Sequence, residues 1–255
     1  MMKYYIENLY LEITRNCTLE CAHCFKGKKQ NINMPLNIID KVFKDIDKID
    51  FLLLCGGEVL LCDKELERVY FNIKTNNIKV NYISIITNAT ILNSNILKIL
   101  KELSLISNLQ IYISGDKFHF MELEKKKLVD IRNKNVRILK ELLNAKCWDY
   151  QYNEEYKIDK VGNALLLTQK DIDEINSWKI KTNYKIKSEY ETNLKRIRHA
   201  SPFIVNNSIF RYIQVDACGN ISPIYYSYNE EDNLAYGTLN NENSFIENIK
   251  LIKKD

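Results

Sequence analysis

The sequence predicts an α/β fold, a partial (β/α)6 TIM-like barrel with a small C-terminal β-hairpin and helix extension. Short apolar runs typical of buried strands alternate with amphipathic helical patterns from residue 9 to about residue 179. After about residue 205 the pattern changes to that of a hairpin. The 255 residues allow one large domain with a sizeable core, but the repeats are too few for a full eight-fold barrel.

The alternation is clearest in the N-terminal part of the chain. Pro35 suits the first turn of a helix whose apolar positions continue through Ile49, and Phe51–Cys55 is a continuous apolar run. We expect strands at 9–14, 51–55, 79–86, 109–114 and about 147–152. We expect further helices at 63–75, 94–105, 121–144 and about 170–179.

The C-terminal part is expected to be a separate extension. Arg211–Asp216 and Ile221–Ile224 flank Gly219 and Asn220, a pattern typical of a β-hairpin, and residues 243–253 fit an amphipathic helix. We therefore divide the chain into a core of residues 1–204 and an extension of residues 205–255.

Composition excludes several classes of protein. The N-terminus has no apolar signal-peptide core, and no run approaches the length of a membrane span. The seven cysteines, an odd number, argue against a disulfide framework. The net charge of +4 is too small to indicate nucleic-acid binding. We expect a cytoplasmic protein with neither a membrane nor a nucleic acid as partner.

Three cysteines near the N-terminus indicate a metal centre. Cys17, Cys21 and Cys24 form a C-x3-C-x2-C pattern with no fourth cysteine nearby. Three thiolates leave one position of a metal centre open for chemistry, whereas structural centres are normally closed by four protein ligands. The alternatives are a zinc site completed by His23, or three unrelated thiols.

Polar and glycine-rich motifs follow the next predicted strands: Gly56-Gly57-Glu58, Thr87-Asn88 and Ser114-Gly115-Asp116. Ligands of α/β sheets bind at the carboxyl ends of the strands. Glycines let backbone approach a ligand closely, and a carboxylate can accept hydrogen bonds from an ammonium group. The alternatives are an ordinary tight turn at the glycine pair and helix N-capping by Ser114 and Asp116.

Together these motifs resemble the radical S-adenosylmethionine (SAM) enzymes over roughly residues 9–165. The resemblance implies a [4Fe-4S] cluster held by Cys17, Cys21 and Cys24, with SAM on the fourth iron. It implies that the reduced cluster cleaves SAM to methionine and a 5′-deoxyadenosyl radical, which abstracts hydrogen from a substrate. It also implies a reductant protein of the flavodoxin or ferredoxin type.

The same resemblance implies a set of SAM-binding residues. His23 takes the usually aromatic position before the third cysteine, and Gly56-Gly57-Glu58 resembles the GGEP motif, with Val59 in place of Pro. Thr87-Asn88-Ala89 resembles TNG, and Ser114 with Asp116 resembles S-x-D. Val161–Ala164 resembles a G-R-A segment in which Asn163 replaces Arg, so a bidentate grip on the SAM carboxylate would be lost. The implied set is His23, Gly56, Gly57, Glu58, Thr87, Asn88, Ser114, Asp116 and Asn163.

Two further residues are candidates for a role in the reaction. His119 could be a proton donor or substrate contact, because histidine titrates near neutrality, or it could simply be packed. The segment around Cys218 resembles the start of twitch or SPASM extensions, whose cysteines bind auxiliary clusters. No cysteine follows Cys218, so we expect no second cluster and leave open a substrate-binding or catalytic thiol.

The substrate is open between classes. The twitch-like tail favours a peptide, as in peptide maturases, although we expect no leader-binding domain before the cysteine loop. The compact chain favours a small molecule such as a nucleotide or sugar. A non-catalytic metal-binding regulatory module is the alternative of another class, and Gly56-Gly57-Glu58 argues against it because a structural site needs no SAM cradle.

Overall fold

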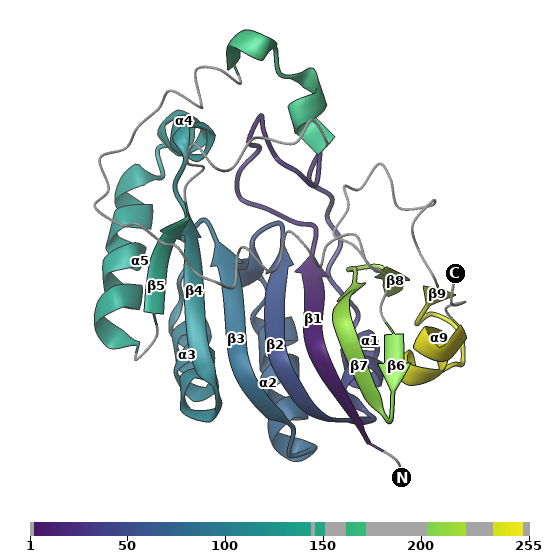
Figure 1. Cartoon of the computed structure of the whole chain (residues 1–255). Coiled ribbons are helices and arrows are strands. Elements are labelled where there is room, and N and C mark those ends of the chain that lie inside the picture. The colour runs from purple at the N-terminus through teal and green to yellow at the C-terminus, as the bar shows by residue number, and fades with distance from the viewer. Residues whose placement is uncertain (1–2, 144–145, 151–161, 172–202, 223–236, 252–255) are drawn as a thin grey trace.

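A computed structural model of the chain describes residues 3–143, 146–150, 162–171, 203–222 and 237–251 (Figure 1). Its centre is one sheet with the strand order β5-β4-β3-β2-β1-β7-β8-β9, and β6 pairs with β7. The strands are β1 (Tyr4–Thr14), β2 (Ile46–Gly56), β3 (Lys79–Thr87), β4 (Asn108–Ser114), β5 (Lys146–Tyr150), β6 (Phe203–Val205), β7 (Ser208–Val215), β8 (Asn220–Ser222) and β9 (Gly237–Thr238).

Strands β1 to β5 are parallel to their neighbours, and β7 runs parallel to β1 on its other side. All six therefore end at the same edge of the sheet, where the cysteine loop follows β1. No pairing joins β5 to β6–β9 in the described part of the chain, so hydrogen bonds do not close the barrel. The predicted α/β fold with an open, mostly parallel sheet is confirmed.

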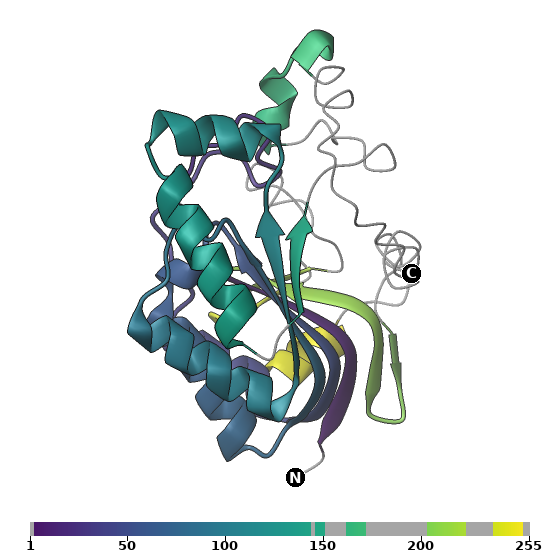
Figure 2. The same cartoon turned by 90° about the vertical axis from the view of Figure 1, so that its left-hand side faces the viewer.

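One face of this curved sheet is covered by α1 (Leu36–Phe43), α2 (Asp63–Thr75), α3 (Ser94–Ile106), α5 (Val129–Leu142) and α9 (Phe245–Leu251) (Figure 2). Helix α4 (Lys117–Lys125) and the short 3-10 turn η2 (Gly162–Leu166) lie beyond the carboxyl ends of the strands (Figure 1), and a further 3-10 turn, η1 (Val59–Leu61), follows β2. The main core lies between sheet and helices. A smaller cluster, built around Tyr10, Phe51 and Tyr212, lies on β1, β2 and β7 outside this main core.

Two predicted helices were wrong in their limits. The helix starting after Pro35 ends at Phe43, and Ile46 and Ile49 belong to β2, where they pair with β1. A short apolar run fits a helix or a strand equally well by periodicity. The single helix predicted at 121–144 is two helices, because Lys127 adopts a left-handed φ of 56° that ends α4. No Gly or Pro marks that break in the sequence.

The C-terminal hairpin is confirmed as β7 and β8, which pair antiparallel around Gly219. A further hairpin, β6–β7, turns at Asn206 and Asn207, both with left-handed φ, and was not predicted. Ser244 and Glu247 exchange hydrogen bonds as a capping box that starts α9. Because β7 pairs with β1, the predicted core and extension share one sheet, and their division at residue 204 stays a prediction.

The helix predicted near 170–179 falls almost wholly outside the described residues. Among the described residues, no helix has the length and apolar character needed to cross a membrane.

Candidate metal and cofactor site

The cysteine loop is fixed at its start by the backbone of the glycine pair. Gly57 N–H donates to the Thr14 carbonyl at 2.9 Å, and Glu58 N–H donates to the Asn16 carbonyl at 2.8 Å. A Cβ on Gly56 would lie 2.0 Å from the Thr14 carbonyl oxygen, and one on Gly57 would lie 2.2 Å from that of Asn16. Both glycines are therefore required by the close approach of two strand ends, whatever else they contact.

The three cysteines lie in a shared apolar setting. Their neighbours are Leu19, Phe120, Leu123, Leu128 and Val129, from the loop itself, α4 and the start of α5. Burial, reinforced by the negative charge of Glu58, raises the pKa of Cys17 to about 12. Burial also raises the pKa of Cys21 and of Cys24. Three soft thiol donors on one loop, largely shielded from water, suit an iron–sulfur cluster, which holds such thiols as thiolates.

Glu58 is fully buried and joins the ends of β2 and β3. Its carboxylate accepts hydrogen bonds from Leu60 N–H at 2.9 Å, the Thr87 hydroxyl at 2.6 Å and Asn88 N–H at 2.7 Å. Burial raises its pKa, although these three donors oppose that effect. A carboxylate with this many donors still has a lone-pair position left for one more, so a contact with an ammonium group stays compatible with the geometry.

The Thr87-Asn88-Ala89 turn connects Glu58 to the cysteine loop. The Asn88 amide nitrogen lies 3.0 Å from the Thr18 hydroxyl and 3.6 Å from Cys17 Sγ. Ala89 is buried with a left-handed φ of 59°, a conformation that favours glycine. This backbone geometry explains why glycine suits the third position of such a motif.

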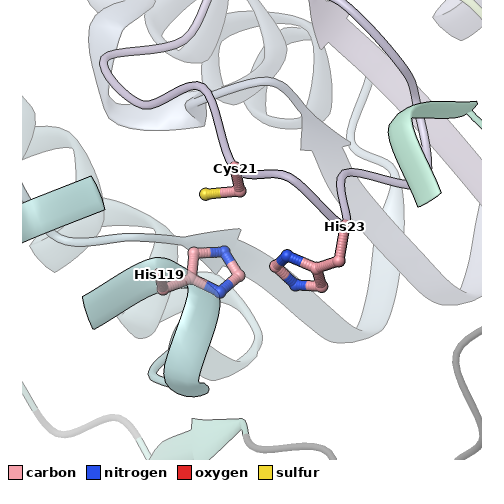
Figure 3. Close-up of side chains that lie close together, drawn as sticks. All are labelled: Cys21, His23 and His119. Atoms are coloured by element: carbon pink, nitrogen blue, oxygen red, sulfur yellow. The ribbon is translucent and has the colours of Figure 1, made fainter. Parts of the chain in front are cut away.

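Asp116 unites two histidines at the start of α4. Its Oδ1 caps the helix by accepting from Phe118 N–H at 2.9 Å and His119 N–H at 3.1 Å, so the predicted capping role is confirmed. Its Oδ2 lies 3.0 Å from His23 Nε2 and 2.7 Å from His119 Nδ1. Figure 3 shows the two histidines side by side, without Asp116. Burial raises the pKa of Asp116, but the two histidines outweigh it and hold the pKa far below its usual range.

His23 is buried between aromatic rings. It stacks on Phe118, with ring centroids 4.7 Å apart, and meets His119 edge-on at 4.9 Å. Burial lowers the pKa of His23 against the opposing effect of Asp116, so the ring is neutral near pH 7. The sequence pointed to all of these residues except Phe118, but it gave no sign that Asp116 would link the two histidines.

Ser114 and Asn163 also lie around this loop. The Ser114 carbonyl, at the end of β4, accepts from the Arg132 guanidinium at 3.1 Å. Asn163 donates from its backbone N–H to the Cys24 carbonyl at 3.0 Å and from its side chain to the Cys21 carbonyl at 3.1 Å. Asn163 therefore holds the cysteine loop in place. The sequence comparison, in which Asn163 occupies the position of an arginine, did not indicate this role.

Cys218 belongs to a second buried polar group. Its N–H donates to Asp216 Oδ1 at 2.9 Å, while Asp216 Oδ2 lies 3.0 Å from Arg15 Nη2. Both Arg15 and Asp216 are buried, as are the paired Glu12 and Lys26, whose charged atoms are 3.1 Å apart. The sequence analysis missed both ion pairs, because no motif marks them and Arg15 and Asp216 are 201 positions apart in the chain.

Comparison with known proteins adds the family. A model described as the Radical SAM superfamily matches residues 11–149, more than half of the chain. Uncharacterized protein MJ0907 of Methanocaldococcus jannaschii is 32% identical over 106 residues, which cover 39% of this chain and 36% of that protein. The match thus spans about a third of that relative.

Two solved structures, both of anSMEcpe, share the fold. Histidine-tagged anSMEcpe with bound AdoMet (SAM) aligns over 96% of this chain and 80% of its own, with 16% identity and a TM-score of 0.51. Native anSMEcpe with AdoMet and the Cp18Cys peptide covers the same shares at 16% identity and 0.50. Streptococcus suis SuiB bound to its precursor peptide SuiA covers 87% and 59% at 13% identity, with a TM-score of 0.45.

Proposed function

Because this chain belongs to the radical SAM superfamily, whose cofactors are a [4Fe-4S] cluster and SAM, we propose that it generates a 5′-deoxyadenosyl radical and abstracts hydrogen from a peptide. The observation that carries the cofactor part is the cysteine loop. It presents three buried or half-buried thiols inside an apolar shell, anchored to the ends of β1 and β2. The cluster, when bound, supplies the electron that cleaves SAM.

In this proposal Cys17, Cys21 and Cys24 hold the cluster. The apolar side chains around them exclude water, and Asn163 fixes the loop through two of its carbonyls. Asn88 lies close enough to Cys17 Sγ to donate a hydrogen bond to it, which stabilises the thiolate form.

The proposed SAM site lies at the neighbouring strand ends. Glu58 would accept from the SAM amino group, next to Thr87 and Asn88, and His23 would contact the nucleoside from beside Cys24. Because Gly56 and Gly57 have no side chains, SAM could approach the backbone closely at this point. Ser114 ends β4 and Asp116 caps α4, and in this proposal both would line the far side of the SAM site. All of these residues meet at one edge because their strands are parallel.

A peptide substrate is supported by the fold-sharing structure of anSMEcpe, which holds a Cp18Cys peptide. His119, half-buried beside His23, is proposed as the residue nearest the substrate. We propose a flavodoxin- or ferredoxin-type protein as reductant, because cluster chemistry of this kind consumes electrons one at a time. We also propose that the protein works in the cytoplasm.

Anaerobic reconstitution tests this function. We expect about four irons and four sulfides per chain, and 5′-deoxyadenosine formed from SAM only when a reductant is added. Replacing each of Cys17, Cys21 and Cys24 with Ala should abolish the cluster. Cys218→Ala is the matched control and should leave the iron content unchanged.

Two results would contradict the proposal. A fully loaded protein that does not cleave SAM is not a radical SAM enzyme in function. Loss of half the iron in Cys218→Ala would show a second cluster. The substrate class is tested separately, by incubating the active enzyme with deuterium-labelled peptides, nucleotides and sugars. If deuterium is transferred to 5′-deoxyadenosine from a small molecule and from none of the peptides, the proposal of a peptide substrate is wrong.

A further inference from the structure

A second group of metal ligands lies beside the proposed cluster. Cys21, His23 and His119 each offer one ligand atom, and these three atoms lie within 4.8 Å of one another (Figure 3). Around tetrahedral zinc, nitrogen and sulfur ligands are roughly 3.3 to 3.6 Å apart. The ligand atoms of the three side chains therefore need to approach one another by up to about 1.2 to 1.5 Å to share one ion. Two of them are buried, and His119 lies at the first turn of α4.

Asp116 prepares both histidines for such an ion. An ionised carboxylate can only accept hydrogen bonds, so His23 Nε2 and His119 Nδ1 both carry their proton toward Oδ2. Whenever either ring is neutral, its lone pair is therefore on the other nitrogen, Nδ1 of His23 or Nε2 of His119. Histidines that bind metals almost always donate their second N–H to a carboxylate in this way. A single carboxylate oxygen sets the tautomer of both rings here.

We propose that the cluster-free protein binds one divalent metal ion with a preference for nitrogen and sulfur, such as Zn²⁺, through Cys21, His23 and His119. Imidazole and thiolate are the ligands that zinc favours, and three protein ligands leave the fourth position for water. Asp116 is the positioning residue of this site.

The consequence is two mutually exclusive metal states. Cys21 is shared between this site and the proposed cluster, so a chain that holds the ion cannot complete the cluster until the ion is removed. This part rests on the proposed function, whereas the binding of the ion itself does not. As metal ligands, His23 and His119 serve only the single-ion state, and Cys17 and Cys24 serve only the cluster.

The test is metal binding by the cluster-free protein under anaerobic, reducing conditions. Zn²⁺ is titrated in competition with a chromophoric chelator, and Co²⁺ is used as a spectroscopic probe of the ligands. We expect one ion per wild-type chain, with a Co²⁺ spectrum of a tetrahedral site bearing a single thiolate. Affinity should fall at least about tenfold in His119→Phe and by about 10- to 100-fold in Asp116→Asn, which keeps the helix cap.

Matched variants make the test decisive. Cys17→Ser, in the same loop but outside the ligand set, should keep wild-type zinc affinity, whereas Cys21→Ser should lose it. His119→Asn, which retains a side-chain donor for Asp116, guards against misfolding of His119→Phe and should also lose zinc. Equal losses in Cys17→Ser and Cys21→Ser, with wild-type affinity in both His119 variants, would place the ion on the cysteine triplet and overturn the proposal.

Iron loading separates this proposal from the function above. His119→Phe should still take up the full cluster, and prior addition of one Zn²⁺ should block cluster assembly in the wild type but not in His119→Phe. If zinc blocks cluster assembly equally in the wild type and in His119→Phe, the proposal that the zinc site and the cluster exclude each other through Cys21 is wrong. If the wild type binds zinc as described but never assembles a cluster, the proposed function fails and the zinc site stands.

Discussion

Replacing Gly57 with alanine should strongly destabilise the protein and displace the cysteine loop. The added Cβ would lie 2.2 Å from the carbonyl oxygen and 2.7 Å from the carbonyl carbon of Asn16. Both are backbone atoms, which cannot rotate away as the end of a side chain can. The strand ends must separate, and the hydrogen bonds from Gly57 to Thr14 and from Glu58 to Asn16 are lost with them.

The size of the effect follows from these contacts. Two backbone hydrogen bonds contribute about 1 kcal/mol each, and forced backbone strain adds about 1 to 3 kcal/mol. We expect the free energy of unfolding to fall by about 3 to 5 kcal/mol, measured by urea denaturation. Iron uptake on reconstitution should fall as well, because Asn16 immediately precedes Cys17.

Gly237→Ala is the matched control. There the new Cβ would meet only the side chain of Asn248, with its oxygen at 3.2 Å and its carbons at ordinary contact distances of 3.7 and 3.8 Å, so a small shift of that side chain relieves the contact. Its free energy of unfolding should stay within about 0.5 kcal/mol of wild type. If Gly57→Ala is as stable as Gly237→Ala and takes up full iron, strand-end packing is not the reason for the glycine.

Three further predictions concern the buried groups Glu58, Cys17 and Arg15. Glu58→Gln should lower the free energy of unfolding by about 2 kcal/mol, because its amide nitrogen cannot accept from backbone N–H groups; an unchanged urea midpoint would contradict this. In the cluster-free protein, Cys17, with its pKa near 12, should be alkylated at pH 8 at least ~100-fold more slowly than the free amino acid cysteine. The alkylation rate, measured by mass spectrometry, should increase as the pH rises. Arg15→Met should cost about 3 to 5 kcal/mol because the buried carboxylate of Asp216 loses the compensating charge of Arg15, whereas Lys29→Met, in an exposed pair, should change stability little.

The fold was predictable where local pattern and burial agree. Helix α2 has the predicted limits, and β3, α3 and β4 agree within two residues, because their apolar spacing is unambiguous. Prediction failed where the signal is not local. Ile46 and Ile49 join a strand because β1 pairs with them, and α4 ends at Lys127 without a glycine or proline.

The site divides in the same way. The cysteines and the strand-end motifs are visible in the sequence, since their spacing and their places after strands follow from the chain alone. The partners of their side chains are not visible. Glu58 binds Thr87 and Asn88, and Asp116 links His23 to His119, because the parallel sheet brings separate strand ends together. Such contacts depend on tertiary geometry that no spacing encodes.

The pairing of β1 with β7 sets an order on how the molecule assembles. β1 carries the cysteine loop at its end, yet one of its two edges is completed only by a strand near the other end of the chain. The Arg15–Asp216 contact that reinforces this pairing joins residues 201 positions apart. Contacts of such long range form slowly, because closing the long loop between the two segments costs conformational entropy. During synthesis the three cysteines therefore leave the ribosome early, and β1 can pair only with β2 until β7 has been made.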